Sequence, residues 1–240
     1  MSVTGTDGGQ TALEDIAGGV AQDWLAIGWF TPDYRPLAER FATNLAEHGA
    51  PFHLFAKPKL APGWNTTRKP AVVMQAMDAY PGKTPILMDV DCVIKGNIAP
   101  VTNVAGDVAI TILARNMRKG AVWQHWIAAE CSSRVVVFRP TDRARAFARR
   151  WAEQIESSSL SHDEHSMVWA FLASSDVRFD YIDPAYSGRE VDRLPDGVIV
   201  HESAYSARPE AAQRDPEAPG TWGRPSSRWP SSAFWRVLLG

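Results

Sequence analysis

The stretch TPILMDVDCVIKGN, from Thr84 to Asn97, decides how this chain is interpreted. It opens with a short apolar run, which predicts a buried strand. Two aspartates, Asp89 and Asp91, follow the run with one residue between them. Because alternate residues of a strand point to the same side, we expect both carboxylates to emerge together at the carboxyl end of this strand.

Strand-like and helix-like segments alternate on both sides of this stretch. We expect further strands at 23–33, 51–58, 106–113, 132–140, 177–183 and 197–203, and helices at 34–49, 69–80, 141–157 and 161–174. This alternation predicts an α/β protein with a mostly parallel central sheet flanked by helices.

The ends of the chain differ from its middle. The small, polar and Gly-rich segment 1–19 is predicted to be disordered, and 20–206 to form the domain. The segment 207–240 is rich in Pro, Arg and Trp, and we expect an irregular C-terminal tail that docks on the domain through Trp222, Trp229 and Trp235.

Composition sets limits on function. The chain has 240 residues, 45% hydrophobic and 22% charged, as expected of a globular protein with a sizeable core. The formal net charge of -2 argues against general nucleic-acid binding. We find no apolar run of about 18 residues for a membrane span and no export signal, so we expect a cytoplasmic protein with Cys92 and Cys131 as free thiols.

Two carboxylates held close together repel each other unless a cation, a proton or hydrogen-bond donors compensate. A divalent ion such as Mn²⁺ or Mg²⁺ suits oxygen ligands, so Asp89 and Asp91 are candidate metal ligands. One of them could instead bind a ribose hydroxyl. The simpler alternative is a turn at the strand end, where Asp is common.

The segment ILMDVDCVIKGNI resembles the Asp-x-Asp strand of glycosyltransferases with the GT-A fold. Other pieces occur in that family's order from Asp23 to Tyr205. They are WLAIGWFTPDY with its following helix, WNTTRKPAVVMQAMDAY before the aspartates, and SSRVVVFRP with the later helices up to HDEHSMVWAF. The resemblance implies a Rossmann-like GT-A fold and transfer of a sugar from a nucleoside diphosphate sugar, for which we expect a UDP-sugar and an unknown acceptor.

The resemblance also implies roles for the residues that hold the metal ion. Asp91 would bind Mn²⁺ or Mg²⁺ directly, and Asp89 would contact the ion, a water bound to it or the donor ribose. His201 ends the last apolar strand, where a late histidine of the family completes the metal site. A strand-end histidine held by hydrogen bonds is the alternative for His201.

Further residues fall near the donor and the acceptor on this interpretation. Thr31 would lie near the nucleotide base, and Arg68 and Lys69, before a helix, near the diphosphate. Asp163 would act as the general base of an inverting enzyme, whereas a retaining enzyme needs none. The alternative for Asp163 is a helix cap, and the two histidines of HDEH leave a zinc site open.

Two other function classes share these features. A nucleotidyltransferase uses a similar sheet and metal, but such enzymes usually have a Gly-rich phosphate loop, and the segment after the first strand reads GWFTPDYRP with no Gly cluster. A nucleotide- or carbohydrate-binding module without turnover is the non-enzyme alternative.

Overall fold

The computed structural model describes residues 13–60, 65–117, 126–157, 163–189 and 196–202. The chain divides into two units, Met1–Ser203 and Ala204–Gly240, and the described residues all belong to the first. The predicted docking of the tail 207–240 therefore lies outside the described residues.

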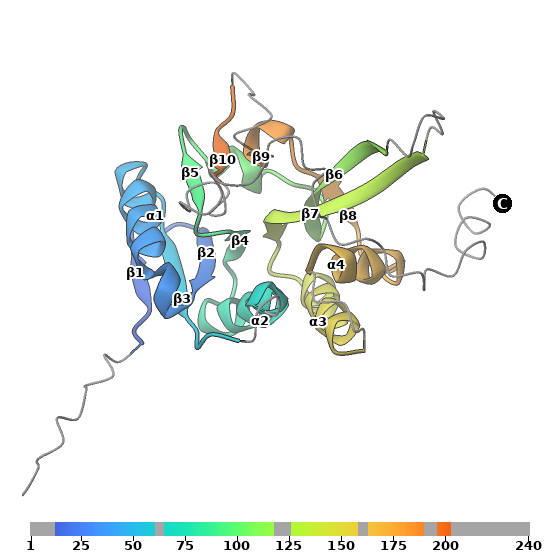
Figure 1. Ribbon diagram of the computed structural model, residues 1–240, viewed down its shortest axis with the longest axis horizontal. Coiled ribbons are helices and arrows are strands. Elements are labelled where there is room, and N and C mark those ends of the chain that lie inside the picture. The colour runs from blue at the N-terminus through green and yellow to red at the C-terminus, as the bar shows by residue number, and fades with distance from the viewer. Residues whose placement is uncertain (1–12, 61–64, 118–125, 158–162, 190–195, 203–240) are drawn as a thin grey trace, which may run out of the picture. The chain divides into compact units, whose positions relative to one another are not determined.

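A seven-stranded sheet with the strand order β1-β3-β2-β4-β7-β6-β8 forms the centre of this unit (Figure 1). Its strands are β1 (Ile16–Gly18), β2 (Trp24–Phe30), β3 (Phe52–Ala56), β4 (Thr84–Met88), β6 (Val108–Met117), β7 (Trp126–Phe138) and β8 (Phe179–Tyr181). The pairings make five strands run in one direction and β1 and β7 in the other. The predicted α/β class with a mostly parallel sheet is confirmed.

The N-terminal segment differs from the prediction of disorder through Gly19. Ile16–Gly18 form β1, which pairs antiparallel with β3. Asp15 fixes this strand, because its carboxylate accepts a hydrogen bond from the Ala56 amide at 2.7 Å and contacts Nε2 of His53 at 2.8 Å. Pairing with an existing sheet edge thus orders residues whose own composition favours disorder.

Helices cover both faces of the sheet. They are α1 (Arg35–Glu47), α2 (Lys69–Ala79), α3 (Asp142–Ser157) and α4 (Asp163–Leu172), with short 3-10 helices at Pro32–Tyr34, Asn65–Arg68, Ala99–Thr102 and Pro184–Tyr186. One apolar core joins α1 to the sheet, and a second joins α2, α3 and α4 to it. Alternation along β2 explains the division, since Ala26 lies in the first core and Leu25 and Ile27 in the second.

Local sequence signals set the helix ends. The Oγ1 atom of Thr141 accepts a hydrogen bond from the Ala144 amide at 3.1 Å and so caps α3. Phe147 and Trp151, one turn apart on α3, are fully buried as their spacing predicts. After α1 the chain turns at Gly49, which has a φ of 64° that other residues rarely adopt.

A second, three-stranded sheet has the order β5-β10-β9. It consists of β5 (Cys92–Ile94), β9 (Gly188–Arg189) and β10 (Ile199–His201), with β10 antiparallel to β5 and parallel to β9. Its strands appear together in Figure 1, above the end of β4. Within the described part of the chain, no helix is both long and apolar enough to cross a membrane.

Candidate functional site

The two aspartates of the opening stretch lie at the carboxyl end of β4, but the strand ends at Met88, so they follow it and are not part of it. The Asp89 amide donates to the carbonyl of Arg134 on β7 at 3.2 Å, and the Cys92 amide returns to the Asp89 carbonyl at 3.0 Å. The first bond joins the end of β4 to β7, and the second closes a tight turn that contains Asp91, between β4 and β5. Gly28 on β2 allows the close approach here, because a Cβ atom at that position would lie 2.9 Å from the Met88 carbonyl oxygen.

The pairing of β10 with β5 brings His201 to the aspartates. His201 pairs with Cys92, and the Glu202 amide donates to the Asp91 carbonyl at 2.9 Å. The Nε2 atom of His201 lies 3.1 Å from Oδ1 of Asp91 and 3.5 Å from Oδ2 of Asp89. One ligand atom from each of the three residues falls within 4.8 Å of the other two.

This donor set fits a divalent ion. Neighbouring ligands at about 2.1 Å from an octahedral Mg²⁺ lie about 3.0 Å apart, and those of the slightly larger Mn²⁺ a little further. The 3.1 and 3.5 Å separations around His201 are close to that spacing. Two carboxylates and one imidazole also supply the oxygen and nitrogen atoms that such ions accept. Among the described residues this is the one cluster of suitable side chains, and it suggests a divalent metal site.

The zinc alternative receives no support from the described residues. His165 is not part of any cluster of potential ligands found there, and His162 lies outside the described residues.

Lys69 occupies the interior behind Asp89. It is the first residue of α2, only 3% exposed, and its ammonium group lies 2.8 Å from Oδ1 of Asp89 and 2.9 Å from Oδ2 of Asp163. It also donates to the Oγ and carbonyl oxygen of Ser133 at 3.0 and 3.1 Å. Four oxygen atoms therefore surround the Lys69 ammonium group. The resemblance had implied that this group would lie near the donor diphosphate.

Asp163 completes this buried group. Its side chain is 9% exposed, its Oδ2 atom accepts a hydrogen bond from the Ser133 hydroxyl at 2.5 Å, and its carbonyl accepts one from Nε1 of Trp151 at 3.0 Å. The predicted general base would instead need a carboxylate that faces an acceptor hydroxyl. In the structure the Asp163 carboxylate holds Lys69 and Ser133.

The charges of this region change the protonation of its members. Burial alone would raise the pKa of Asp89, but the Lys69 ammonium and His201 outweigh it and lower the pKa to about 2. Burial would lower the pKa of His201, whereas hydrogen bonds to Asp89 and Asp91 raise it to about 9. Burial would lower the pKa of Lys69 as well, yet the charges of Asp163 and Asp89 raise it. Near neutral pH and without metal, the Asp89 carboxylate thus lies between a lysine and a histidine that are both charged.

The remaining predicted site residues lie at the ends of β2 and the start of α2. Thr31, just after β2, is 2% exposed, and its hydroxyl donates to Oδ1 of Asp33 at 2.6 Å. Arg68 is the N-cap residue of α2. Its Nε atom is buried and has no hydrogen-bond partner in the part of the chain that the structure describes. Buried polar atoms are usually hydrogen-bonded, so this nitrogen stands out among the described residues.

Sequence reasoning missed Ser133 and Asn44. Ser133 joins Lys69 to Asp163, and the polar residues at the start of SSRVVVF were the only signal for it. Asn44 on α1 bonds to the backbone of Ile94 in β5. Nothing in the periodicity of α1 distinguishes Asn44 from other polar residues of that helix.

No protein-family model and no curated protein sequence matches the chain. Among solved structures, a glycosyltransferase involved in glycosylation of the major capsid of PBCV-1 superposes with a TM-score of 0.54 at 13% identity, covering 75% of this chain and 92% of that one. The glycosyltransferase GlyE of Streptococcus pneumoniae TIGR4 gives 0.49 at 10% identity, with 74% and 54% covered. The first comparison shows that the chain has the fold of a glycosyltransferase, and the expected fold is confirmed.

Proposed function

We propose that this protein is a metal-dependent glycosyltransferase that moves a sugar from a nucleoside diphosphate sugar to an acceptor hydroxyl group, with a UDP-sugar as the expected donor. One observation carries the proposal. In a chain with the fold of a glycosyltransferase, Asp89, Asp91 and His201 meet where β4 ends. Ligands of open α/β sheets bind outside the carboxyl ends of the strands, which is where this cluster lies.

Asp89, Asp91 and His201 would hold Mn²⁺ or Mg²⁺, with Asp91 as the principal ligand. A bound ion would act as a Lewis acid and stabilise the negative charge of the departing nucleoside diphosphate. The protein's own part is to keep three ligand atoms within 4.8 Å of one another before the ion arrives. To release His201 for the ion, its proton must be lost, so metal binding and deprotonation are coupled.

Arg68 is the donor-binding residue with the best support. Its Nε atom lacks a partner among the described residues, and the residue stands at the N-terminus of α2. Helix N-termini and guanidinium groups both attract phosphate. Main-chain groups beside Thr31 would contact the nucleotide base, because that residue follows β2, the strand next to β4.

Lys69 and Asp163 take a supporting part in this proposal. Lys69 binds Oδ1 of Asp89, which leaves Oδ2 on the side of His201. Asp163 and Ser133 keep the Lys69 ammonium in place. The predicted use of Asp163 as general base is therefore replaced by a role in holding the residue that orients Asp89.

The test is a panel of nucleotide-sugars incubated with the full chain and Mn²⁺, in which release of nucleoside diphosphate and sugar transfer are both measured. Chelation should abolish turnover, and Asp91→Asn should weaken both Mn²⁺ and UDP binding. Asp78→Asn is a matched control, because the Asp78 side chain is 69% exposed and pairs with Arg145 of α3. Unchanged Mn²⁺ and UDP binding by Asp91→Asn would contradict the proposed metal site.

Adding a nucleoside triphosphate together with a sugar phosphate to the panel separates the two alternatives. A nucleotidyltransferase would release pyrophosphate when given a nucleoside triphosphate and a sugar phosphate. A binding module would bind a nucleotide-sugar and turn over none of the panel. The uracil base of the donor and a cytoplasmic location stay predictions from the sequence.

A further inference from the structure

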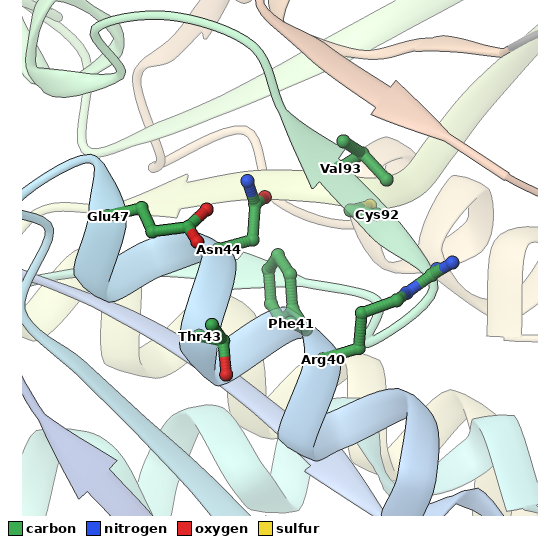
Figure 2. Close-up of a pocket in the computed structure, with 7 residues that line it drawn as sticks. All are labelled: Arg40, Phe41, Thr43, Asn44, Glu47, Cys92 and Val93. Carbon is green, nitrogen blue, oxygen red and sulfur yellow. The ribbon is translucent and has the colours of Figure 1, made fainter.

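The outer flank of α1 forms one wall of a shallow groove whose other wall is β5 (Figure 2). The groove has a volume of about 410 Å³ and is lined by Arg40, Phe41, Thr43, Asn44, Glu47, Cys92 and Val93. Arg40 and Asn44 lie one helical turn apart and therefore on the same face of α1. Both residues connect α1 to the small sheet that carries the candidate metal ligands.

Asn44 contacts β5 as a neighbouring strand would. Its Nδ2 atom donates to the Ile94 carbonyl at 3.1 Å, and its Oδ1 atom accepts from the Ile94 amide at 2.6 Å. β5 is an edge strand of its sheet, so its outward N–H and C=O groups face no strand of that sheet. One side chain thus satisfies both backbone groups of a residue that is 1% exposed.

Arg40 contacts the end of β10. Its Nη1 atom lies 3.0 Å from Oε2 of Glu202, the residue after His201. Both side chains are well exposed, at 49% and 39%, so this pair is weak. The Glu202 amide in turn donates to the Asp91 carbonyl. Of these two polar links between α1 and the small sheet, Asn44 is therefore the stronger and Arg40 the weaker, and both add to the apolar core that α1 shares with β5 and β10.

The metal candidates fall into two groups by what supports them. Asp89 follows β4, a strand of the main sheet, and Lys69 holds its carboxylate. His201 ends β10 and Asp91 immediately precedes β5, and these two strands have three residues each and belong to a sheet too small to be rigid by itself. The bond from the Cys92 amide to the Asp89 carbonyl fixes where β5 begins. The direction of β5 beyond that point, and with it the position of β10 and His201, depends on what ties β5 to the rest of the domain.

We propose that Asn44 is a positioning residue for the metal site, which it serves by fixing β5, and through it Asp91 and His201, relative to Asp89. The proposal deepens the metal-dependent function and rests on it for its consequence in metal binding. Its structural part, the restraint of β5 and β10 by α1, does not require a metal.

The experiment compares Asn44→Ala with Thr43→Ala in the full chain. Thr43 lines the same groove, but its hydroxyl bonds to the Glu39 carbonyl within α1. Hydrogen exchange is measured on the metal-free proteins, and the dissociation constant for Mn²⁺ alone is measured well below the melting temperature. Asn44→Ala should speed hydrogen exchange in both β5 and β10 at least about tenfold and leave exchange in β4 unchanged. It should also weaken Mn²⁺ binding by about tenfold, which is the lower end of the loss in metal affinity seen when residues that support metal ligands are replaced.

Each outcome decides a different point. If exchange in Asn44→Ala rises at Ile94 alone, with β10 and Mn²⁺ affinity as in Thr43→Ala, the positioning role is overturned. If the wild-type protein binds no Mn²⁺, the proposed metal site fails, and the exchange data still decide whether Asn44 restrains β10. Asn44→Asp keeps the acceptor for the Ile94 amide and loses the donor, so exchange intermediate between wild type and Asn44→Ala is expected.

Discussion

Replacing Lys69 with methionine is the sharpest test of the buried charge group. The substitution keeps the length and the apolar stem of the side chain and removes its ammonium group. Two carboxylates, of Asp89 and Asp163, then lose the cation that lies 2.8 and 2.9 Å from their oxygen atoms. Ser133 loses a donor to its hydroxyl and to its carbonyl.

The size of the effect follows from the burial of Lys69, which is 3% exposed. Removing one partner of a buried ion pair costs about 3–5 kcal/mol, because the remaining charge has lost both water and its partner. A domain of this size loses roughly 2–4 °C of melting temperature per kcal/mol, which gives a decrease of roughly 6–20 °C.

The assay is urea unfolding of the metal-free chain followed by circular dichroism, with thermal unfolding as a second measure. Lys59→Met is the matched control. Lys59 pairs with Asp33, but the two side chains are 56% and 38% exposed, so its loss should change the free energy of unfolding by no more than about 1 kcal/mol. Adding Asp163→Asn to Lys69→Met should recover part of the loss by removing one of the two carboxylate charges that Lys69 had neutralised.

Equal free energies of unfolding for Lys69→Met and Lys59→Met would refute this reasoning. That result would mean that the carboxylates reach water or take up protons at no cost once the lysine is gone.

Three further predictions concern different parts of the chain. In the metal-free protein the raised pKa of His201 should add to the free energy of unfolding, with the full contribution below a pH of about 6.5 and a loss of that contribution as the pH rises to about 9. His201→Gln should abolish this pH dependence when the free energy of unfolding is measured across the same range. Arg68→Met should weaken UDP binding by roughly 10–100-fold, which corresponds to the loss of a hydrogen bond to a charged group, and should leave uridine binding unchanged. Calorimetry with both ligands measures the two affinities, and equal losses for UDP and uridine would argue against a contact between Arg68 and phosphate. Phe147→Ala, at a fully buried ring 5.1 Å from that of Phe179, should cost about 3–5 kcal/mol in urea unfolding without altering Mn²⁺ affinity, and a cost near zero would mean that this core refills.

The strand and the paired aspartates could be predicted because they depend on residues next to each other in the chain. An apolar run of strand length defined β4 and placed the two aspartates directly after it, although a turn, and not the alternation of a strand, brings Asp89 and Asp91 together. The apolar run before His201 defined β10 in the same way. The antiparallel direction of β7 could not be predicted, because a fully buried strand has the same apolar pattern in either direction.

The interior of the site could not be predicted because its members are close only in space. Lys69, Ser133 and Asp163 come from α2, β7 and α4, and each had an ordinary local explanation as a solvated charge, a strand-end residue or a helix cap. The strand β1 was missed for a related reason. Its three residues gain their stability from β3 and from the contact of Asp15 with His53, neither of which the Gly-rich segment reveals.

The pairing of β10 with β5 has a consequence for the order in which the chain is made. A ribosome releases the N-terminal part first, and domains begin to fold during synthesis. The main sheet, with Asp89 and Asp91 at the end of β4, is complete in sequence once β8 has emerged, whereas His201 is added later in the last described strand. A nascent chain that ends before Ile199 therefore holds Asp89 and Asp91 of the candidate metal site but not His201. Capture of a metal ion by all three ligands, and any sugar transfer that depends on it, must wait until β10 has been synthesised and has docked beside β5.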